Sequence, residues 1–189
     1  NGESRKAYSF DGASAIGLPK SGNIFKSQPD KASLSFWFNT NDHTQSAVMV
    51  TVPNLIGVYS RQGDGKAAVD EGILPFFSGN SGDLTNQEFG GNIRDGRWHH
   101  VAAINNGEIT TVYVDGINKG QNKESLTNIA DSYSGIGAAV LGINDFAIQY
   151  TGSIDDIRIY NRALSEAEVA ALYELEKPQP AVVSISPGS

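Results

Sequence analysis

Along most of the chain, apolar and polar residues alternate with a period close to two, which indicates β-strands with one buried face. Turn residues, above all Gly, Asn and Asp, fill the segments between them, such as 79–96 and 118–135. Several short strands joined by such loops predict an all-β fold, a two-sheet antiparallel β-sandwich or jelly roll. The segments predicted as strands are Ala7–Phe10, Ala32–Asn39, Ala47–Val52, Leu55–Ser60, Ile73–Phe77, Trp98–Asn105, Ile109–Asp115, Ala138–Ile143 and Ser153–Tyr160.

The same alternation predicts which side chains fill the core. Phe36 and Phe38 share one face of their strand, so Trp37 lies on the other face, where packing against a helix or a long loop is expected. Asp115-Gly116 lies between two apolar stretches, and this dipeptide favours a type I′ hairpin turn. The other side chains expected to point inward are Trp98, Ile104, Val112, Val114, Ile157 and Ile159.

One short helix is predicted after the last strand. The spacing of apolar residues becomes helical there, with Ser165 as the N-cap and Glu168 completing a capping box. Val169 and Leu172 are expected to turn inward, and Leu175 is a further candidate.

The C-terminal composition predicts the domain organisation. Residues 1–176 are expected to form the sandwich with its helix, and Pro178 and Pro180 favour an extended spacer beyond it. Residues 177–189 are therefore predicted to be a linker or the start of a following domain. The module is expected to be one part of a longer secreted or surface protein, with other domains of the same chain as neighbours.

Composition removes several classes of protein. The 189 residues include no cysteine, which excludes disulfide scaffolds, thiolate metal sites and cysteine nucleophiles. With 14 Lys and Arg against 21 Asp and Glu, the net charge is −7, so nucleic acid is not an expected partner. No segment approaches the roughly 20 apolar residues of a membrane span, and no membrane insertion is expected. The absence of cysteine and of Asn-x-Ser/Thr sequons favours a bacterial protein that is extracellular or on the cell surface.

Three blocks of sequence occur in a recognisable order. They are YSFDG at 8–12, DGRWHHVAAI at 95–104 with YVDG at 113–116, and GSIDDIRIYNRALS at 152–165. Together they resemble the laminin-G-like, concanavalin A-like lectin/glucanase jelly-roll family. The resemblance implies a sandwich of two antiparallel sheets in a secreted or cell-surface protein. It further implies a module that binds glycans or other surface ligands, often with a calcium ion.

The last of these blocks holds the main candidates for a metal site. By strand alternation, Asp155 is in register with Ile157 and Ile159, an apolar side where a carboxylate is costly unless it is hydrogen-bonded or bound to a cation. The resemblance implies a calcium ion between the region 10–12 and this strand. The alternative is that these aspartates cap loop amides or open turns. The candidate calcium ligands are Asp11 and Asp155, followed by Asp156 and Asp30.

The histidine pair His99-His100 lies within a predicted strand, where adjacent side chains point to opposite faces. The two rings therefore cannot easily chelate one ion, and no third ligand stands at a spacing typical of zinc sites. Packed, hydrogen-bonded histidines are the favoured interpretation.

Loops at the ends of a sandwich can supply both aromatic faces and hydrogen-bonding groups to a saccharide. The alternative for each such residue is an ordinary role in a turn or in packing. The candidate ligand-binding residues are Phe89, Asn92 and Asp95 in one loop, and Asn144, Asp145 and Tyr150 in another.

Catalysis has no positive signal in the sequence. The glucanases of the family that it resembles carry a Glu-x-Asp-x-x-Glu strand motif, which is absent, and no Gly-x-Ser-x-Gly nucleophile turn occurs. The expected function is a non-catalytic, calcium-stabilised module that binds carbohydrate or acts in adhesion. The alternatives are a structural or protein-interaction spacer without a sugar site and, with less support, a glycoside hydrolase or polysaccharide lyase.

Overall fold

A computed structural model describes residues 7–18, 30–43, 47–52, 56–60, 73–76, 93–122, 134–142 and 145–177. Within these ranges one helix, α1 (Glu166–Glu176), follows the last strand. The strands are β1 (Tyr8–Asp11), β2 (Ile16–Leu18), β3 (Ala32–Asn39), β4 (Ala47–Val52), β5 (Ile56–Ser60), β6 (Ile73–Phe76), β7 (Trp98–Asn105), β8 (Thr110–Val114), β9 (Ile117–Asn122), β10 (Ser134–Ile136), β11 (Ala139–Gly142), β12 (Asp145–Ala147) and β13 (Thr151–Tyr160).

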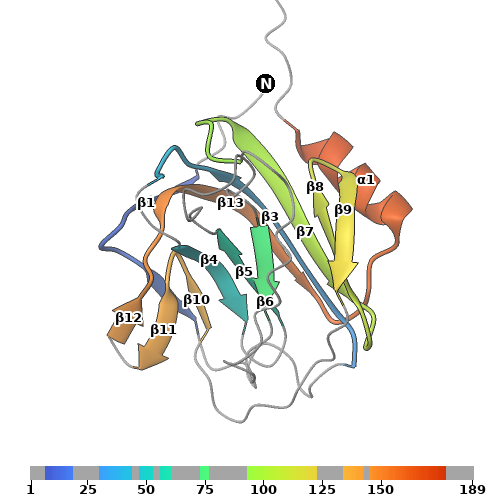
Figure 1. Cartoon of the computed structure of the whole chain (residues 1–189), viewed down its shortest axis with the longest axis horizontal. Helices are drawn as coiled ribbons and strands as arrows, with labels where there is room; N and C mark the ends of the chain where they lie inside the picture. The colour runs from blue at the N-terminus through green and yellow to red at the C-terminus, as the bar shows by residue number, and fades with distance from the viewer. Residues whose placement is uncertain are drawn as a thin grey trace, which may run out of the picture.

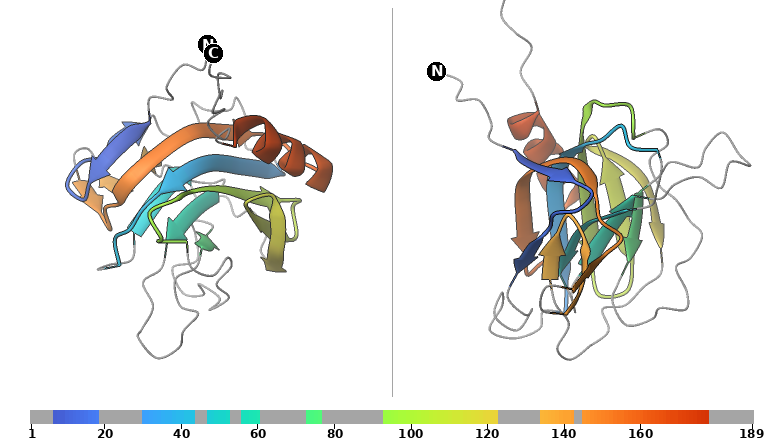
Figure 2. Two further views of the ribbon diagram at one scale, coloured as in Figure 1. Left: turned by 90° about the horizontal axis from the view of Figure 1, so that it is seen from above. Right: turned by 90° about the vertical axis from the view of Figure 1, so that its left-hand side faces the viewer.

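The strands form two stacked antiparallel sheets (Figure 1). The six-stranded sheet has the order β1-β13-β3-β7-β8-β9 and the five-stranded sheet the order β2-β10-β4-β5-β6, while β11 and β12 pair separately. Seen from above, the six-stranded sheet curves around the five-stranded one, and α1 lies on its outer side (Figure 2). The predicted two-sheet sandwich with one C-terminal helix is confirmed.

The main core fills the space between the two sheets. Phe36 and Phe38 of β3 are fully buried there, with Val112 of β8 beside them and Met49 and Val50 of β4 supplied by the facing sheet. Burial of such side chains removes apolar surface from water and is the dominant favourable term in folding. The inward positions expected from the alternation of β3 and β8 are therefore confirmed.

A second, smaller apolar cluster lies on the outer side of the six-stranded sheet, beneath α1. Ile104 belongs to it, together with Leu164 and Val169. Trp98 pairs with Asn39 on the same outer side and is only half-buried. Ile104 is a buried core residue as expected, although it lies on the outer side of the sheet. The expectation that Trp98 belongs to the core is wrong, because the alternation of β7 turns it outward and leaves it half-buried.

Helix α1 is joined to this outer face by stacking and by a buried carboxylate. Trp37, 2% exposed, stacks on Tyr173 with ring centroids 5.6 Å apart and an interplanar angle of 17°. Its Nε1 donates a hydrogen bond to Glu176 Oε2 at 3.2 Å. The Glu176 Oε1 atom accepts from Arg158 Nε at 2.5 Å. The expectation that Trp37 packs against a helix is confirmed.

The local signals for α1 are also confirmed. The Ser165 side chain accepts from the Glu168 N–H, and the Glu168 side chain accepts from the Ser165 N–H, which completes the capping box. Val169 is fully buried and Leu172 is packed beneath the helix. Leu175 is 74% exposed, so the expectation that it turns inward is wrong.

Strand β13 contains a β-bulge that simple alternation does not predict. Its register against β3 shifts between Asp155 and Arg158, and Asp156 has a φ of 49°. Fully buried Ile154 thus lies on the inner face, whereas Asp155, which pairs with Trp37, lies on the outer one. The expectation that Asp155 enters the apolar side of the strand is wrong, because the inserted residue reverses the alternation beyond it.

The predicted hairpin at Asp115-Gly116 is confirmed, since both residues have positive φ (53° and 74°) and join β8 to β9. Part of the segment 118–135, which is expected to be a loop, forms strands instead. Edge strands can be polar and strands of three residues show little alternation, so the sequence pattern does not reveal them. The strands missing from the sequence-based assignment are β2, β9, β10 and β12.

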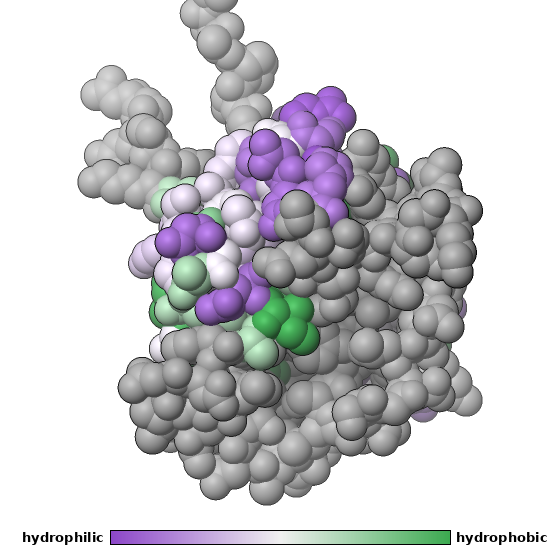
Figure 3. All heavy atoms as spheres, turned by 60° about the vertical axis from the view of Figure 1, so that its left-hand side comes forward, coloured by the Kyte–Doolittle hydropathy of each residue, from purple (hydrophilic) through white to green (hydrophobic). Residues whose placement is uncertain are grey.

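Large apolar side chains at the described surface are scattered over separate elements. On the face that Figure 3 shows, hydrophobic positions form small areas next to hydrophilic ones. Isolated exposed apolar residues are normal for a globular protein and do not define a docking face. The most exposed are Tyr8 on β1, Ile117 on β9, Ile148 before β13 and Leu175 on α1.

Gly152 offers a test of the packing of β13 against β3. Its φ is 143°, and an added Cβ would collide with the Asn39 backbone oxygen and lie 2.7 Å from the Tyr150 hydroxyl. We expect Gly152→Ala to lower the free energy of unfolding by about 2–4 kcal/mol, measured by urea denaturation. Gly17→Ala is the matched control, since nothing lies within 4 Å of its added Cβ. Equal stability losses in both variants would contradict the packing of β13.

Candidate functional site

An open groove of about 530 Å³ lies on the outer side of the six-stranded sheet, beside the C-terminal end of α1. This volume falls within the roughly 300–1,000 Å³ of typical ligand sites. We call it the Trp98 groove. Its aromatic lining residues are Trp37, Trp98 and Tyr173, and its polar lining residues are Asn39, Arg97, His99, Asp115 and Lys177.

The end of β3 and the start of β7 position the sheet side of this groove. Asn39 and Trp98 are register partners. The turn that leads into β7 is tied back to β3, because Asn39 Nδ2 donates to the Gly96 oxygen at 2.6 Å and the Gly96 N–H donates to the Thr40 oxygen at 3.0 Å. These contacts fix the turn through which the chain enters β7 at Trp98.

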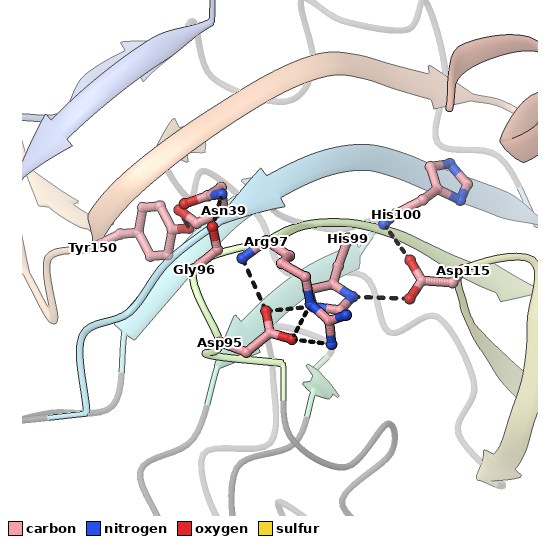
Figure 4. Close-up of polar contacts among 8 residues, drawn as sticks. All are labelled: Asn39, Asp95, Gly96, Arg97, His99, His100, Asp115 and Tyr150. Carbon is pink, nitrogen blue, oxygen red and sulfur yellow. Dashed lines mark hydrogen bonds and ion pairs between the residues drawn. The ribbon is translucent and has the colours of Figure 1, made fainter. Parts of the chain in front are cut away.

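His99 is held between two carboxylates (Figure 4). Its Nδ1 lies 2.8 Å from Asp115 Oδ2, and its Nε2 lies 3.1 Å from Asp95 Oδ1. The hydrogen bond with Asp115, supported by that with Asp95, raises the pKa of His99 despite its partial burial. Because both ring nitrogens face acceptors, this setting favours the imidazolium form. The expectation of a packed, hydrogen-bonded His99 is confirmed.

The two aspartates are held in their ionised forms. Arg97 Nε donates to Asp95 Oδ2 at 2.6 Å, and this guanidinium, helped by His99, keeps the pKa of Asp95 far below its usual value. Burial opposes ionisation of Asp115, but hydrogen bonds from His99 and from the His100 N–H outweigh it, so the pKa of Asp115 is also lowered. Asp95, Arg97, His99 and Asp115 therefore form a network of alternating charges on the side of β7 opposite His100 (Figure 4).

His100 has the opposite environment. It is fully buried on the outer face beneath α1, with its ring 5.4 Å from that of Trp37 and 6.1 Å from that of Tyr173. Neither ring nitrogen has a hydrogen-bond partner among the described residues. Desolvation lowers its pKa from 6.5 to about 4. The ring is packed as expected, but the expected hydrogen bonds are not found for it in this part of the chain.

The burial of Tyr150 contradicts the expectation that its side chain contacts a ligand. It is 1% exposed, packs in the main core against Phe10, and donates its hydroxyl hydrogen to the Asn39 oxygen at 2.9 Å. Its ring is therefore closed to solvent. Burial raises the pKa of this phenol well above its usual value. Tyr150 supports the end of β3 from beneath.

The other predicted ligand-binding residues are divided. Asp95 does not line the Trp98 groove, and its carboxylate contacts Arg97 and His99 instead. Asp145 is the first residue of β12, which pairs with β11. Phe89, Asn92 and Asn144 lie outside the described residues.

The four predicted calcium ligands do not come together. Asp11 pairs with Thr151 at one end of the six-stranded sheet, whereas Asp30 precedes β3 at the other end. Asp155 Oδ1 accepts from the N–H of Asp156 at 2.9 Å. Within the described ranges, no group of three or more His, Cys, Asp or Glu residues could hold a metal ion. These residues do not fit a shared calcium site.

Asp11 instead has the role that the alternative interpretation assigned to it. Its Oδ1 accepts from Ser14 Oγ at 2.6 Å, from the Ser14 N–H at 2.9 Å and from the Ala13 N–H at 3.0 Å. The hydrogen bond from the Ser14 side chain, with those from the two backbone groups, lowers the pKa of Asp11. The carboxylate therefore stabilises the turn after β1.

Sequence reasoning did not identify the main features of the groove. Strand alternation predicts Trp98 in the core, and no local signal marks Arg97 or Lys177 as groove residues. The signal for Trp98 is that it shares a face of the sheet with Trp37 once β3 and β7 are paired. No local pattern in the sequence indicates that α1 lies beside Trp98.

Comparison with known proteins agrees with the fold just described, that of a jelly-roll β-sandwich. Residues 10–170 match the concanavalin A-like lectin/glucanases superfamily, and the chain belongs to that family. A search of curated proteins found no match.

Several solved structures share the fold at low identity. A heptameric SAP-like pentraxin from Limulus polyphemus has a TM-score of 0.66 and 14% identity, covering 93% of this chain and 86% of the pentraxin. Domain 4 of an extracellular arabinanase from Geobacillus stearothermophilus, in complex with arabinotriose, has a TM-score of 0.62 and 19% identity, covering 88% and 76%. The CBM40 of the Ruminococcus gnavus IT-sialidase, bound to α2,3 sialyllactose, has a TM-score of 0.59 and 12% identity, covering 89% and 97%.

His99 and His100 are expected to affect stability with opposite pH dependence. The pKa of His99 is raised above its unfolded value of 6.5, so its contribution is present below about pH 6.5 and is lost as pH rises through the folded-state pKa. We expect His99→Gln to lower the melting temperature more at about pH 5.5 than at about pH 9. A loss that is equal at both pH values would contradict the two-carboxylate setting of His99.

For His100 the sign is reversed. Its folded-state pKa of about 4 lies below 6.5, so stability is lost as pH falls from 6.5 through 4. We expect His100→Phe, which keeps a ring between Trp37 and Tyr173, to remove a penalty that reaches about 3 kcal/mol in acid. The measurement is the difference in urea stability between variant and parent at about pH 7 and pH 4. The difference should grow in favour of the variant at the lower pH.

Substitutions of Asp11 test whether its carboxylate stabilises a turn or binds calcium. As a turn residue, Asp11→Asn keeps the acceptor oxygen and should leave the melting temperature nearly unchanged, whereas Asp11→Ala should lower it, with or without calcium. Melting temperatures are compared in millimolar calcium and in chelator. A calcium-induced rise in the parent that disappears in Asp11→Asn would show that Asp11 binds the ion.

Proposed function

We propose that this protein is a non-catalytic carbohydrate-binding module that holds a saccharide in the Trp98 groove. The observation that carries the proposal is a half-buried tryptophan at an open groove, flanked by hydrogen-bonding side chains on rigid elements. An indole face packs on the apolar face of a sugar ring, and polar groups around it satisfy the hydroxyls. Asn39, the register partner of Trp98, supplies such a group on the same face of the sheet.

Rigidity supports the proposal. Asn39 is fixed by its bond to Gly96, and Arg97 is oriented by Asp95. Groups that are already held in place lose little conformational entropy when a ligand binds. A shallow groove of this kind suits a flexible saccharide polymer, of which only a short stretch contacts the protein.

The comparisons point in the same direction. The family includes lectins in its name, and the arabinanase domain and the CBM40 were each solved with an oligosaccharide. At the identities found, these structures support the fold, and the ligand is our inference. An extracellular location, as part of a longer protein, is consistent with such a role. None of the described helices is long and apolar enough to cross a membrane.

The proposed binding does not depend on calcium. Among the described residues, the predicted calcium ligands do not form a group that could hold a metal ion, and none of them lines the groove. We therefore expect saccharide affinity to be the same in chelator and in millimolar calcium.

The decisive experiment is a glycan array followed by calorimetry on the glycans that bind. We expect Trp98→Ala to weaken binding by about 10-fold or more, because stacking on an aromatic face is lost. Tyr8→Ala is the matched control: it removes an aromatic side chain that is 60% exposed on β1, and should leave affinity unchanged.

Three results would contradict the proposal. Silence across an array of neutral and acidic glycans would favour the alternative of a structural or protein-interaction spacer. Hydrolysis or β-elimination of a polysaccharide by the purified protein would show catalysis. Glycan binding that survives Trp98→Ala but is lost in Tyr8→Ala would place the site elsewhere on the sandwich.

A further inference from the structure

The C-terminal end of α1, residues 173–177, forms one wall of the Trp98 groove. Tyr173 and Lys177 line the groove from this helix end, whereas Trp37, Asn39 and Trp98 line it from the sheet. A saccharide that contacts both walls touches Tyr173 and Lys177 only while the helix end lies against the sheet, which we call the docked state. Such a ligand binds the docked state more tightly than an undocked one.

A side chain outside the groove attaches this wall to the sheet. Glu176 is 3% exposed, and its Oε2 accepts from Trp37 Nε1 at 3.2 Å. Its Oε1 accepts from Arg158 Nε at 2.5 Å and forms an ion pair with Arg158 Nη2. Neither Glu176 nor Arg158 lines the groove. Because a carboxylate buried without these donors would be costly, the position of the helix end depends on this contact.

The docked state gives Tyr173 a defined place. Its ring stacks on Trp37, with the centroids 5.6 Å apart. On the hairpin between β8 and β9, a Cβ added to Gly116 would lie 3.0 Å from Tyr173 Cδ1, so the turn also packs against the ring. The docked helix end therefore offers a ligand a preorganised wall.

Other features of α1 oppose docking of its C-terminal end. Glu174 and Glu176 lie at the negative end of the helix dipole, and the last turn contains no basic residue. The fully buried His100 ring beneath the helix has no hydrogen-bond partner among the described residues, which is costly for a polar group. The N-terminal end, by contrast, is fixed by the capping box of Ser165 and Glu168. An 11-residue helix is marginal by itself, so its C-terminal end needs the Glu176 contact.

We propose that Glu176 is the positioning residue of the Trp98 groove, and that saccharide binding is coupled through it to the docking of the end of α1. The inference rests on the proposed function and adds a conformational control to the same site. Only the docked state binds with full affinity, so the apparent affinity is the intrinsic affinity multiplied by the docked fraction. By reciprocity, the saccharide stabilises the docked state by the same coupling factor.

Substitutions outside the groove test the coupling. Glu176→Gln removes the charge that pairs with Arg158, and Arg158→Gln removes the other partner; the Arg158 side chain is 41% exposed, so its loss disturbs the core less. We expect each variant to weaken saccharide binding by about 10-fold, and the double variant to weaken it little further, because both act through one contact. Glu166→Gln is the matched control, an exposed carboxylate in the first turn of the same helix, and should leave affinity unchanged.

Affinity is measured by calorimetry. The probe is the tightest binder among cellohexaose, xylohexaose, a galactan hexasaccharide and the glycans that the array identifies. Met49→Ala, in the core on the facing sheet, controls for stability. It should lower the melting temperature and leave affinity unchanged at temperatures where it is folded.

Amide hydrogen exchange over residues 170–177 measures docking independently of affinity. We expect exchange there to be faster in Glu176→Gln than in the parent, and to slow again when saturating saccharide is added. Exchange in β7 should not change. The factor by which the docked fraction falls should match the factor by which affinity falls.

The outcomes separate this inference from the proposed function. Equal affinity in Glu176→Gln and the parent, despite faster exchange in α1, would overturn the coupling and leave the carbohydrate site intact. Tighter binding in Glu176→Gln would also overturn it, because the docked helix would then block the site. A loss of affinity that Met49→Ala shares would reflect stability alone and would overturn it too. Absence of binding of every glycan to the parent would overturn the proposed function together with the coupling.

Discussion

The contact between Trp37 and the last turns of α1 is the interaction on which the outer face of this protein depends. Trp37 stacks on Tyr173 and donates to Glu176, and Arg158 of β13 donates to the same carboxylate. Glu176 is 3% exposed, so its charge is compensated by these donors rather than by water. Because the helix is held at this point, the exposed end of β7 and the end of α1 border a groove. Without the contact, Trp98 would lie on an open sheet surface.

The charges around that groove show how a fold can set the reactivity of neighbouring residues. His99 and His100 are adjacent in sequence, yet the pKa of one is raised and that of the other lowered. The strand turns one ring toward two carboxylates and the other beneath a helix. Asp95 also accepts from Arg97, and Asp115 also accepts from the His100 N–H.

Much of the fold could be predicted because its determinants are local. Alternation located β3, β4 and β7, the Asp115-Gly116 dipeptide located the hairpin, and Ser165 with Glu168 located the start of α1. The site could be predicted much less well. The bulge at Asp156 reverses the alternation of β13, so Asp155 does not share a face with Ile157 and Ile159. Tyr150 is buried and supports the end of β3 through its hydroxyl group. Neither effect leaves a periodic signal.

The amino-acid sequence by itself determined that this chain forms an antiparallel sandwich with a capped terminal helix, and three ordered blocks indicated its family. These properties depend on residues that are close in the chain, where backbone geometry and hydrophobic period act directly. Only the tertiary structure decided that Trp98 faces outward, that α1 borders it, and that Asp95 and Asp115 meet at His99. Such contacts join segments that are distant in sequence, and their existence depends on register and packing rather than on any local pattern.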